Sequence, residues 1–273
     1  MLKTVACIIA RTNSTRLPKK VLKNVNSKFT LIEYLIEKTK KSRLVDEIYI
    51  CTSKHIDDQV LKKVAEKKGV KFYAGSLDSV IDRMLDVAKL EKATDVIRIT
   101  GDNIFTDEVY LDIMIDQHFK KKVEYTRTEN LPIGVTAEVI KVEALKRCYN
   151  LMNPEESQYL MLYMFQPSIF KCLVLLPEIR HSQPNYSLTV DTPLDFERTL
   201  RIISSNDLLS LDQILETCNK KEIKNLIYKK NGMVKFPANL KIYFETYRIE
   251  MDMRIKMSSI YNVKPGEYLN YKK

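Results

Sequence analysis

A loop rich in cations and hydroxyl groups follows the first apolar run of the chain. Residues 5–9 are apolar, and residues 10–20 include Arg11, Arg16, Lys19 and Lys20 as well as Ser14. Open α/β sheets build phosphate sites in this way, with polar groups delivered at the C-terminal end of a buried strand. Arginine forks also suit bidentate phosphate contacts. The loop therefore predicts an enzyme that binds a polyphosphate.

Two carboxylates later in the chain extend this chemistry. Asp102 follows an apolar run in the segment RITGD, and Asp191 follows another apolar run. Mg²⁺ takes one or two carboxylates together with phosphate oxygens, so both residues are expected ligands of Mg²⁺. Asp195 is the alternative second ligand, although it also suits the first turn of a helix. Two carboxylates and a cationic loop without a histidine base indicate nucleotidyl transfer, which relies on positioning and charge neutralisation.

The elements that must position these residues alternate between strand and helix patterns. The first half predicts strands over residues 4–9, 47–52, 70–73 and 96–100, and helices over 31–40, 57–68 and 78–90. Thr30 and Glu33 form a capping box for the first helix, and Gly69 ends the second. This alternation predicts an α/β fold with a mostly parallel, doubly wound sheet. The carboxyl ends of its strands would bring the polar loops to one edge.

The second half of the chain has a looser pattern. We expect a loop over 132–134, a strand over 137–140, a helix from 142, a strand over 187–190 and a helix ending near 204. The apolar segment 159–165 is expected to be a core helix or a dimer face. From about residue 206 the chain becomes rich in lysine and tyrosine. We therefore predict a nucleotidyltransferase domain over residues 1–205 and a basic C-terminal extension over residues 206–273.

Composition narrows the class of protein further. The chain is 45% apolar and 29% charged, which is ordinary for a soluble globular protein, and no apolar run approaches the about 18 residues of a membrane span. The net charge of +10 is spread over lysine pairs without a nucleic-acid motif, so we expect no nucleic-acid partner. Five cysteines without close spacing suit a reducing cytoplasm, and Cys7 and Cys51 are expected in the core.

Six segments together resemble the cytidylyltransferases that activate sugar acids. The first, ARTNSTRLPKKVL, matches the family signature A-R-x-x-S-T-R-L-P-x-K. The others follow in the family's order: ICTS (50–53), YAGSLDSVIDR (73–83), VIRITGDN (96–103), PIGVTAEV (132–139) and LTVDTPLDFE (188–197). The chain is similar to acylneuraminate and 3-deoxy-manno-octulosonate cytidylyltransferases, and above all to the spore-coat polysaccharide biosynthesis protein F group.

This resemblance implies a Rossmann-like nucleotide-diphosphosugar transferase fold, a mostly parallel mixed sheet flanked by helices, with a C-terminal extension. It implies a nucleotidyltransferase of the 2.7.7 class that transfers CMP from CTP to an acidic acceptor and releases pyrophosphate, with Mg²⁺, in surface polysaccharide or glycoconjugate biosynthesis. The implied catalytic residues are Lys20, Arg16 and Asp102. The implied CTP-binding residues are Ala10, Arg11, Ser14, Arg16, Lys20, Thr52, Ser53, Gly75, Ser76 and Asp82. The implied acceptor-binding residues are Pro132, Gly134, Glu138 and Gln158. A homodimer is also implied, with segment 159–165 as its candidate face.

The chain departs from the family pattern at several positions. Lys19 stands where the family has glycine, which indicates either a looser turn or an added phosphate contact. Thr136 replaces an acid, and the EHVT-like acceptor segment reads ESQYLMLY, with Gln158 and Tyr159 in place of the acid and the histidine. The acceptor therefore stays open between a sugar acid, a phosphonate and another phosphate compound.

Two other functions compete with nucleotidyl transfer. One is a nucleotide-sugar-dependent glycosyltransferase on the same fold, for which a DxD-like metal motif is expected where this chain has GDN. The other is a non-catalytic homologue that binds an acidic partner through its basic C-terminal extension. The joint presence of Arg16, Lys20, Asp102 and Asp191 favours the enzyme.

Overall fold

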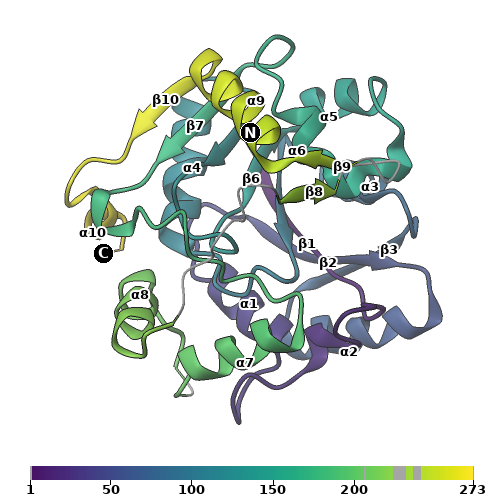
Figure 1. The fold of residues 1–273 in the computed structure, drawn as a ribbon. Coiled ribbons are helices and arrows are strands. Elements are labelled where there is room, and N and C mark those ends of the chain that lie inside the picture. The colour runs from purple at the N-terminus through teal and green to yellow at the C-terminus, as the bar shows by residue number, and fades with distance from the viewer. Residues whose placement is uncertain (1, 206, 224–231, 236–240, 273) are drawn as a thin grey trace.

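An eight-stranded sheet forms the centre of the molecule in the computed structural model, which describes residues 2–205, 207–223, 232–235 and 241–272 (Figure 1). The strand order is β10-β7-β5-β6-β4-β1-β2-β3. Neighbouring strands run parallel except at β6, which is antiparallel to both β4 and β5. The predicted mostly parallel sheet is therefore confirmed. The strand bounds are β1 (Thr4–Ile9), β2 (Glu47–Ser53), β3 (Lys71–Gly75), β4 (Asp95–Thr100), β5 (Tyr125–Thr128), β6 (Glu138–Lys141), β7 (Cys172–Leu176) and β10 (Ser259–Asn262).

Strand β1 lies between β2 and β4, and its sequence suits this central position. Residues 5–8 have no exposed surface, which confirms the predicted core position of Cys7. A continuous apolar run is typical of a parallel strand that is covered on both faces. The register places Ile9 opposite Cys51 of β2 and Thr100 of β4. The loops that follow these three strands therefore start side by side.

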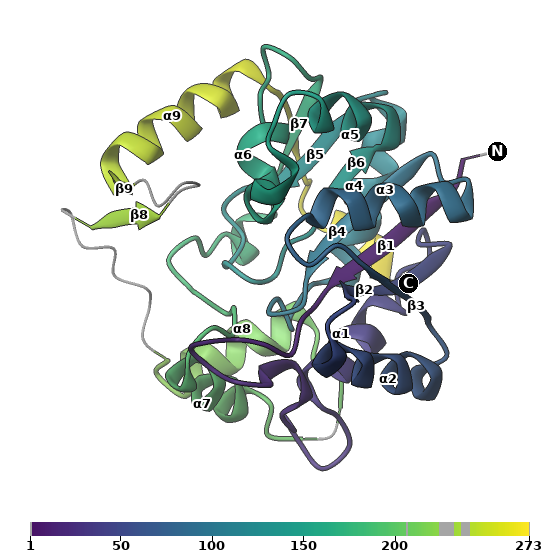
Figure 2. The same ribbon diagram turned by 90° about the vertical axis from the view of Figure 1, so that its right-hand side faces the viewer.

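Helices cover both faces of the sheet (Figure 2). The buried side chains of one helical layer join one apolar cluster, and those of the other layer join a second cluster. Among the described residues, no helix combines the length and apolar character that crossing a membrane requires. The first layer holds α1 (Leu31–Thr39), α2 (Val60–Lys68), α4 (Glu108–Lys120), α7 (Pro193–Ile202), α8 (Leu211–Lys220) and α10 (Glu267–Lys272). The second holds α3 (Val80–Glu91), α5 (Val142–Tyr149), α6 (Leu160–Met164) and α9 (Phe244–Met257). Short 3-10 helices lie between these elements: η1 (Lys20–Leu22), η2 (Ile56–Gln59), η3 (Pro154–Tyr159) and η4 (Ile179–His181).

Local capping signals account for several helix boundaries. The Thr30 hydroxyl accepts a hydrogen bond from the backbone N–H of Glu33, and the Glu33 carboxylate accepts one from the backbone of Thr30, as the capping box predicts. Gly69 ends α2 in the left-handed conformation, with φ 60°. Helix α3 begins at Val80, slightly later than predicted, because Ser79 is its N-cap.

The apolar segment 159–165 is a core helix, as one of its two interpretations predicts. Leu160, Met164 and Phe165 have no exposed surface. Residues 161–163 are half-buried.

The strand predicted over residues 187–190 is wrong. Within this segment Ser187 makes an isolated parallel bridge with Ile133, and the following residues have no strand partner. The cause is a close contact between two loops. Gly134 has φ +94°, and a Cβ atom there would lie 2.4 Å from the backbone nitrogen of Thr189. Segment 187–190 therefore packs on a glycine rather than on the edge of the sheet.

Most of the described part of residues 206–273 packs with the rest of the fold. β8 (Met233–Lys235) and β9 (Lys241–Tyr243) form a separate two-stranded antiparallel sheet, whereas β10 extends the main sheet in parallel to β7. Helix α10 packs against α4, and its Tyr268 is fully buried. The division of the chain at residue 205 stays a prediction.

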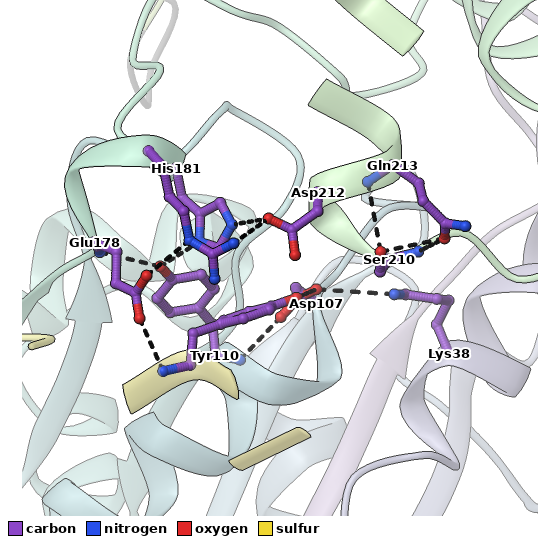
Figure 3. A network of polar contacts seen from close by, with 10 residues as sticks. Lys38, Asp107, Tyr110, Glu178, His181, Ser210, Asp212 and Gln213 are labelled. Carbon is purple, nitrogen blue, oxygen red and sulfur yellow. Dashed lines mark hydrogen bonds and ion pairs between the residues drawn. The ribbon is translucent and has the colours of Figure 1, made fainter. Parts of the chain in front are cut away.

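A buried polar network anchors α10 (Figure 3). The Tyr268 hydroxyl donates a hydrogen bond of 2.9 Å to Asp107, and the Tyr268 backbone N–H donates to Glu178 at 3.0 Å. His181 lies between the Tyr110 hydroxyl and an Asp212 carboxylate oxygen, each 2.8 Å away. Because Asp107 also caps α4, the C-terminal segment stabilises the helix that follows the Asp102 loop.

Candidate active site

The loop after β1 is closed by hydrogen bonds to one carbonyl. The Thr12 carbonyl accepts from the backbone N–H of Ser14 at 3.1 Å and from that of Lys19 at 2.9 Å. Lys19 has φ 53° and ψ 28°, the left-handed conformation that favours glycine. Lys19 therefore adopts the backbone conformation that the family's glycine would favour, and the looser turn predicted as one consequence of this substitution is not observed. The Lys19 side chain is exposed. η1 begins directly afterwards with Lys20.

Lys20 is the centre of the site. Its Nζ donates hydrogen bonds to the Val190 carbonyl at 2.7 Å, to Asp191 Oδ1 at 3.0 Å and to Asp102 Oδ2 at 3.3 Å. Arg16 reaches the same Asp191 oxygen at 3.0 Å. The structure thus brings together the three predicted catalytic residues and both predicted metal ligands, from three separate parts of the chain.

Glycine at position 101 allows a close approach between β4 and the start of the loop. A Cβ atom there would lie 3.0 Å from both the Ile9 carbonyl oxygen and the Ala10 Cβ, so any other residue would push these neighbours away by a few tenths of an ångström. The Gly101 N–H donates to the Ile9 carbonyl at 2.8 Å. From the other side, the Val190 N–H donates to the Asp102 carbonyl at 3.0 Å. These backbone contacts hold the two carboxylate-bearing loops together.

Asp195, the alternative metal ligand, has a structural role. Its carboxylate accepts from the Thr192 backbone and hydroxyl, which completes a capping box for α7, and it pairs with Arg198 at 2.9 Å. Burial raises the pKa of Asp195, but the hydrogen bonds from Thr192 and the nearby Arg198 outweigh it, so the pKa is lowered overall. Asp191 is therefore the carboxylate that faces Lys20.

A cleft of about 930 Å³ opens in front of these residues. Ala10, Arg11, Ser14, Arg16 and Lys20, half of the predicted CTP-binding set, line it.

The other half of that set lies outside the lining of the cleft. Thr52 and Ser53 have no exposed surface, and the Ser53 hydroxyl donates to Asp58. Gly75 is packed against Arg83, and the exposed Ser76 accepts from the backbone N–H at position 79. Asp82 is directed to Tyr149, whose pKa it raises. A direct role of these five residues in binding CTP stays a prediction.

Arg83 is a site residue that we did not predict. It lines the cleft although it is only 1% exposed, its Nη1 lies 3.4 Å from the Cys51 carbonyl, and its Nε has no hydrogen-bond partner among the described residues. Burial lowers the pKa of this guanidinium. The segment YAGSLDSVIDR ends on Arg83. Val80, Arg83 and Val87 have the spacing of one helix face, so the sequence could have indicated that Arg83 faces the interior with these two valines.

A smaller hollow of about 200 Å³ adjoins the cleft and shares Arg98 and Thr100 with it. Arg98 pairs there with Glu138, which also accepts from the Tyr125 hydroxyl. The Arg98 Nε and the Thr128 hydroxyl are buried and make no hydrogen bond within the described chain. The remaining lining is Asn103, Arg127, Thr136, Ala137 and Met161.

The predicted acceptor-binding residues divide between this hollow and its surroundings. Glu138 lines the hollow, and Gln158 lines the neighbouring cleft, where its carbonyl accepts from Arg98 at 3.1 Å. Pro132 and Gly134 lie outside both linings and pack in the loop beside residues 186–189. Contact between these four residues and an acceptor stays a prediction.

A cationic loop, paired carboxylates and a cleft at the carboxyl edge of a parallel sheet define a nucleotide-binding α/β transferase. The family model described as Cytidylyltransferase matches residues 5–230, and the chain therefore belongs to the cytidylyltransferase family of nucleotidyltransferases. The resemblance drawn from the sequence motifs is confirmed.

Two relatives and one solved structure support this assignment. The spore coat polysaccharide biosynthesis protein SpsF of Bacillus subtilis (strain 168) is 34% identical over 197 residues, 70% of this chain and 82% of that protein. A 3-deoxy-manno-octulosonate cytidylyltransferase of Chloroherpeton thalassium is 36% identical over 103 residues, 37% of this chain and 40% of that protein. A cytidylyltransferase structure from Leptospira borgpetersenii serovar Hardjo-bovis is similar with a TM-score of 0.76 and 25% identity, over 84% of this chain and 100% of that one. The predicted Rossmann-like nucleotide-diphosphosugar transferase fold is thereby confirmed.

Proposed function

We propose that this enzyme transfers CMP from CTP to an acidic acceptor and releases pyrophosphate, in the biosynthesis of a surface polysaccharide or glycoconjugate. The meeting of Lys20 and Arg16 with Asp102 and Asp191 at the mouth of the cleft carries the proposal. Such a site can neutralise a triphosphate and hold it in position, which is the main requirement of nucleotidyl transfer.

The donor half of the cleft suits CTP. Arg11, Arg16 and Lys20 supply the positive charge that the triphosphate needs, and Ser14 adds a hydroxyl donor. Arg16 is more available than Lys20, because its side chain is 64% exposed and it has the freedom to move from Asp191 to a phosphate. Lys20 is 13% exposed and is held in place before a substrate arrives.

Asp102 and Asp191 fit a divalent cation. Their oxygens come from separate loops and already converge on one positive charge, the Lys20 ammonium. Among the described residues no three His, Cys, Asp or Glu side chains gather into a metal site, so phosphate and water oxygens would complete the coordination. This is the donor set that Mg²⁺ prefers, and the ion would supply further charge neutralisation at the phosphates.

The hollow beside the cleft suits a small, polyhydroxylated acid. Arg98 and Arg127 offer forks for a carboxylate or phosphate, while Glu138 and the hydroxyl groups around it match hydroxyl groups of an acceptor. The Arg98 Nε and Thr128 hydroxyl are buried and have no hydrogen-bond partner among the described residues, so a ligand would reach them after the surrounding side chains move. A sugar acid offers both an acidic group for the arginines and hydroxyl groups for Glu138, whereas a phosphonate offers mainly the acidic group.

The reaction follows from the two adjacent spaces. An acceptor oxygen forms a bond with the α-phosphorus, and the bond between that phosphorus and the bridging oxygen breaks, so pyrophosphate leaves and the hydroxyl proton passes to solvent. Lys20 and Arg16 stabilise the charge that accumulates on the phosphate oxygens. Arg98, which lines both spaces, orients the acceptor next to the nucleotide.

The test is release of pyrophosphate by the purified protein with Mg²⁺, each nucleoside triphosphate in turn and a panel of sugar acids, phosphonates and phosphate compounds. We expect release that requires CTP, with a CMP-linked product visible by phosphorus NMR, and loss of that product in Lys20→Ala. Sugar transfer from a nucleotide sugar would instead support a glycosyltransferase. Failure to bind CTP, or no turnover with any acceptor, would support a non-catalytic protein.

A homodimer and a cytoplasmic location complete the proposal. Tyr159 and residues 161–163 are half-buried, and they are the part of segment 159–165 that remains available for a partner subunit. Sedimentation velocity is the measurement, and a monomer at all accessible concentrations would contradict the dimer.

A further inference from the structure

A buried carboxylate lies behind the phosphate loop, out of reach of the cleft. Asp58 is in η2 and is 1% exposed. Its Oδ1 accepts from the Thr12 backbone N–H at 2.7 Å and from the Thr12 hydroxyl at 2.8 Å, and its Oδ2 accepts from the Ser53 hydroxyl. Within the described chain Asp58 forms no ion pair, so three hydrogen bonds compensate its burial.

Asp58 is charged at neutral pH. Burial raises its pKa, but the hydrogen bonds from Ser53 and Thr12 outweigh this effect, and the pKa is lowered overall. Hydrogen bonds to a charged acceptor are shorter and stronger than neutral ones. The position of Thr12 is therefore tightly determined.

Thr12 in turn controls the shape of the loop. It is 3% exposed, whereas its neighbours Arg11 and Asn13 are exposed. Its carbonyl accepts from Ser14 and Lys19, so a single residue joins the start of the loop to its end, directly before Lys20. A shift of Thr12 would move both ends of the loop and the cations on it.

We propose that Asp58 is a positioning residue for nucleotide binding, which holds the cationic loop in its binding shape through Thr12. The inference rests on the proposed use of that loop for CTP. Asp58 does not line the cleft, so it acts on the nucleotide site through the loop, and its charge also acts on Arg83. Pre-organisation of this kind reduces the cost of ordering a site when the ligand binds. Loss of the outer contacts that orient metal ligands typically costs about 10- to 100-fold in metal affinity or activity, and we expect a similar scale for this loop.

Asp112 is a control for this role, and it differs from Asp58 in that it also forms an ion pair, with Arg43 Nε at 3.7 Å. Asp112 of α4 is 3% exposed, and its carboxylate accepts from the backbone N–H groups of Arg43 and Leu44 and from the Ser42 hydroxyl. Asp112 therefore also fixes a loop from a buried position, but neither it nor that loop lines the cleft. If the role of Asp58 is purely structural, its replacement and that of Asp112 should have the same effect on CTP affinity.

The experiment compares Asp58→Asn with Asp112→Asn. Calorimetric titration with CTP and Mg²⁺ measures affinity, and thermal unfolding measures stability. We expect both variants to lose stability, but only Asp58→Asn to bind CTP about 10-fold more weakly. Amide exchange without CTP should be faster at residues 12–19 in Asp58→Asn and unchanged there in Asp112→Asn. Equal CTP affinity in the two variants, or unchanged exchange at residues 12–19, overturns the inference.

Milder variants keep the test decisive if Asp58→Asn fails to fold. Ser53→Ala and Thr12→Val each remove one of the three hydrogen bonds, and each should weaken CTP binding by about 2- to 5-fold. If both bind CTP as wild type does, the inference is wrong. If wild-type protein does not bind CTP, the proposed function fails instead, which keeps the two failures distinguishable.

Discussion

Replacement of Lys20 by alanine should disable the enzyme and leave a site that binds cations. The Lys20 ammonium contacts one oxygen of Asp102 and one of Asp191, and both carboxylates are only partly exposed. In Lys20→Ala these two negative charges remain close together, and Arg16 at Asp191 is the one cation among the described residues that still pairs with either of them. The substrate would also lose a fixed positive charge beside its phosphates.

The magnitude follows from the geometry. Both oxygens accept hydrogen bonds from the same nitrogen, so they lie at most about 6 Å apart, and two like charges about 6 Å apart repel by about 3 kcal/mol at an effective dielectric constant of about 20, which the partial exposure of both carboxylates reduces. We expect the free energy of unfolding to fall by about 2 kcal/mol without Mg²⁺. Loss of one preorganised positive group at developing charge costs about 3–4 kcal/mol of transition-state stabilisation, a fall of about 10²–10³ in kcat.

Two assays measure these effects. Pyrophosphate release under saturating CTP gives kcat, and thermal unfolding with and without Mg²⁺ gives the change in stability. Mg²⁺ should raise the Tm of Lys20→Ala more than that of wild type, because it replaces the missing charge between the carboxylates. Lys23→Ala, which removes an exposed lysine a few residues later, should change neither readout appreciably. Turnover of Lys20→Ala within about fivefold of wild type, or no extra stabilisation by Mg²⁺, would refute the reasoning.

Three further variants test other parts of the argument. Asp102→Asn should raise the Mg²⁺ concentration for half-maximal activity at least about 10-fold with the fold intact, and an unchanged requirement would remove Asp102 from the metal site. Lys19→Gly should stabilise the protein by about 0.5–1 kcal/mol by chemical denaturation, since its left-handed backbone suits glycine, and a loss would contradict that strain. Hydrogen bonds from Lys3, Lys71 and Tyr49 lower the pKa of Glu91 to about 2 in the folded protein, whereas the pKa of a glutamate in an unfolded chain is about 4.3. The charged Glu91 therefore stabilises the fold fully above about pH 4.3, and this stabilisation is lost as the pH falls towards about 2. Glu91→Gln should therefore cost about 1 kcal/mol at pH 7 and progressively less below pH 4 in unfolding titrations, and a constant difference would exclude this charge effect.

The first half of the fold was predictable because its signals are local. An apolar run predicted β1, shorter apolar stretches predicted the next three strands, and the Thr30 and Glu33 pair marked a helix start by contacts within one turn. The second half was harder to predict. Segment 187–190 has the composition of a strand, but its partner is a loop with a glycine at position 134. Strand β10 pairs with β7 across more than eighty residues, and its short sequence carries no sign of that neighbour.

The sequence by itself determined the class of chemistry, because cations and hydroxyl groups after a buried strand can form a phosphate loop wherever the rest of the chain lies. The sequence also determined the family, because the six motifs and their order along the chain can be recognised without a structure. Only the tertiary structure decided that Lys20 lies between Asp102 and Asp191, that Arg83 reaches the cleft and that Thr52 is buried. The direction of a side chain depends on which elements pack around it. Those neighbours come from distant parts of the chain, so local patterns carry no record of them.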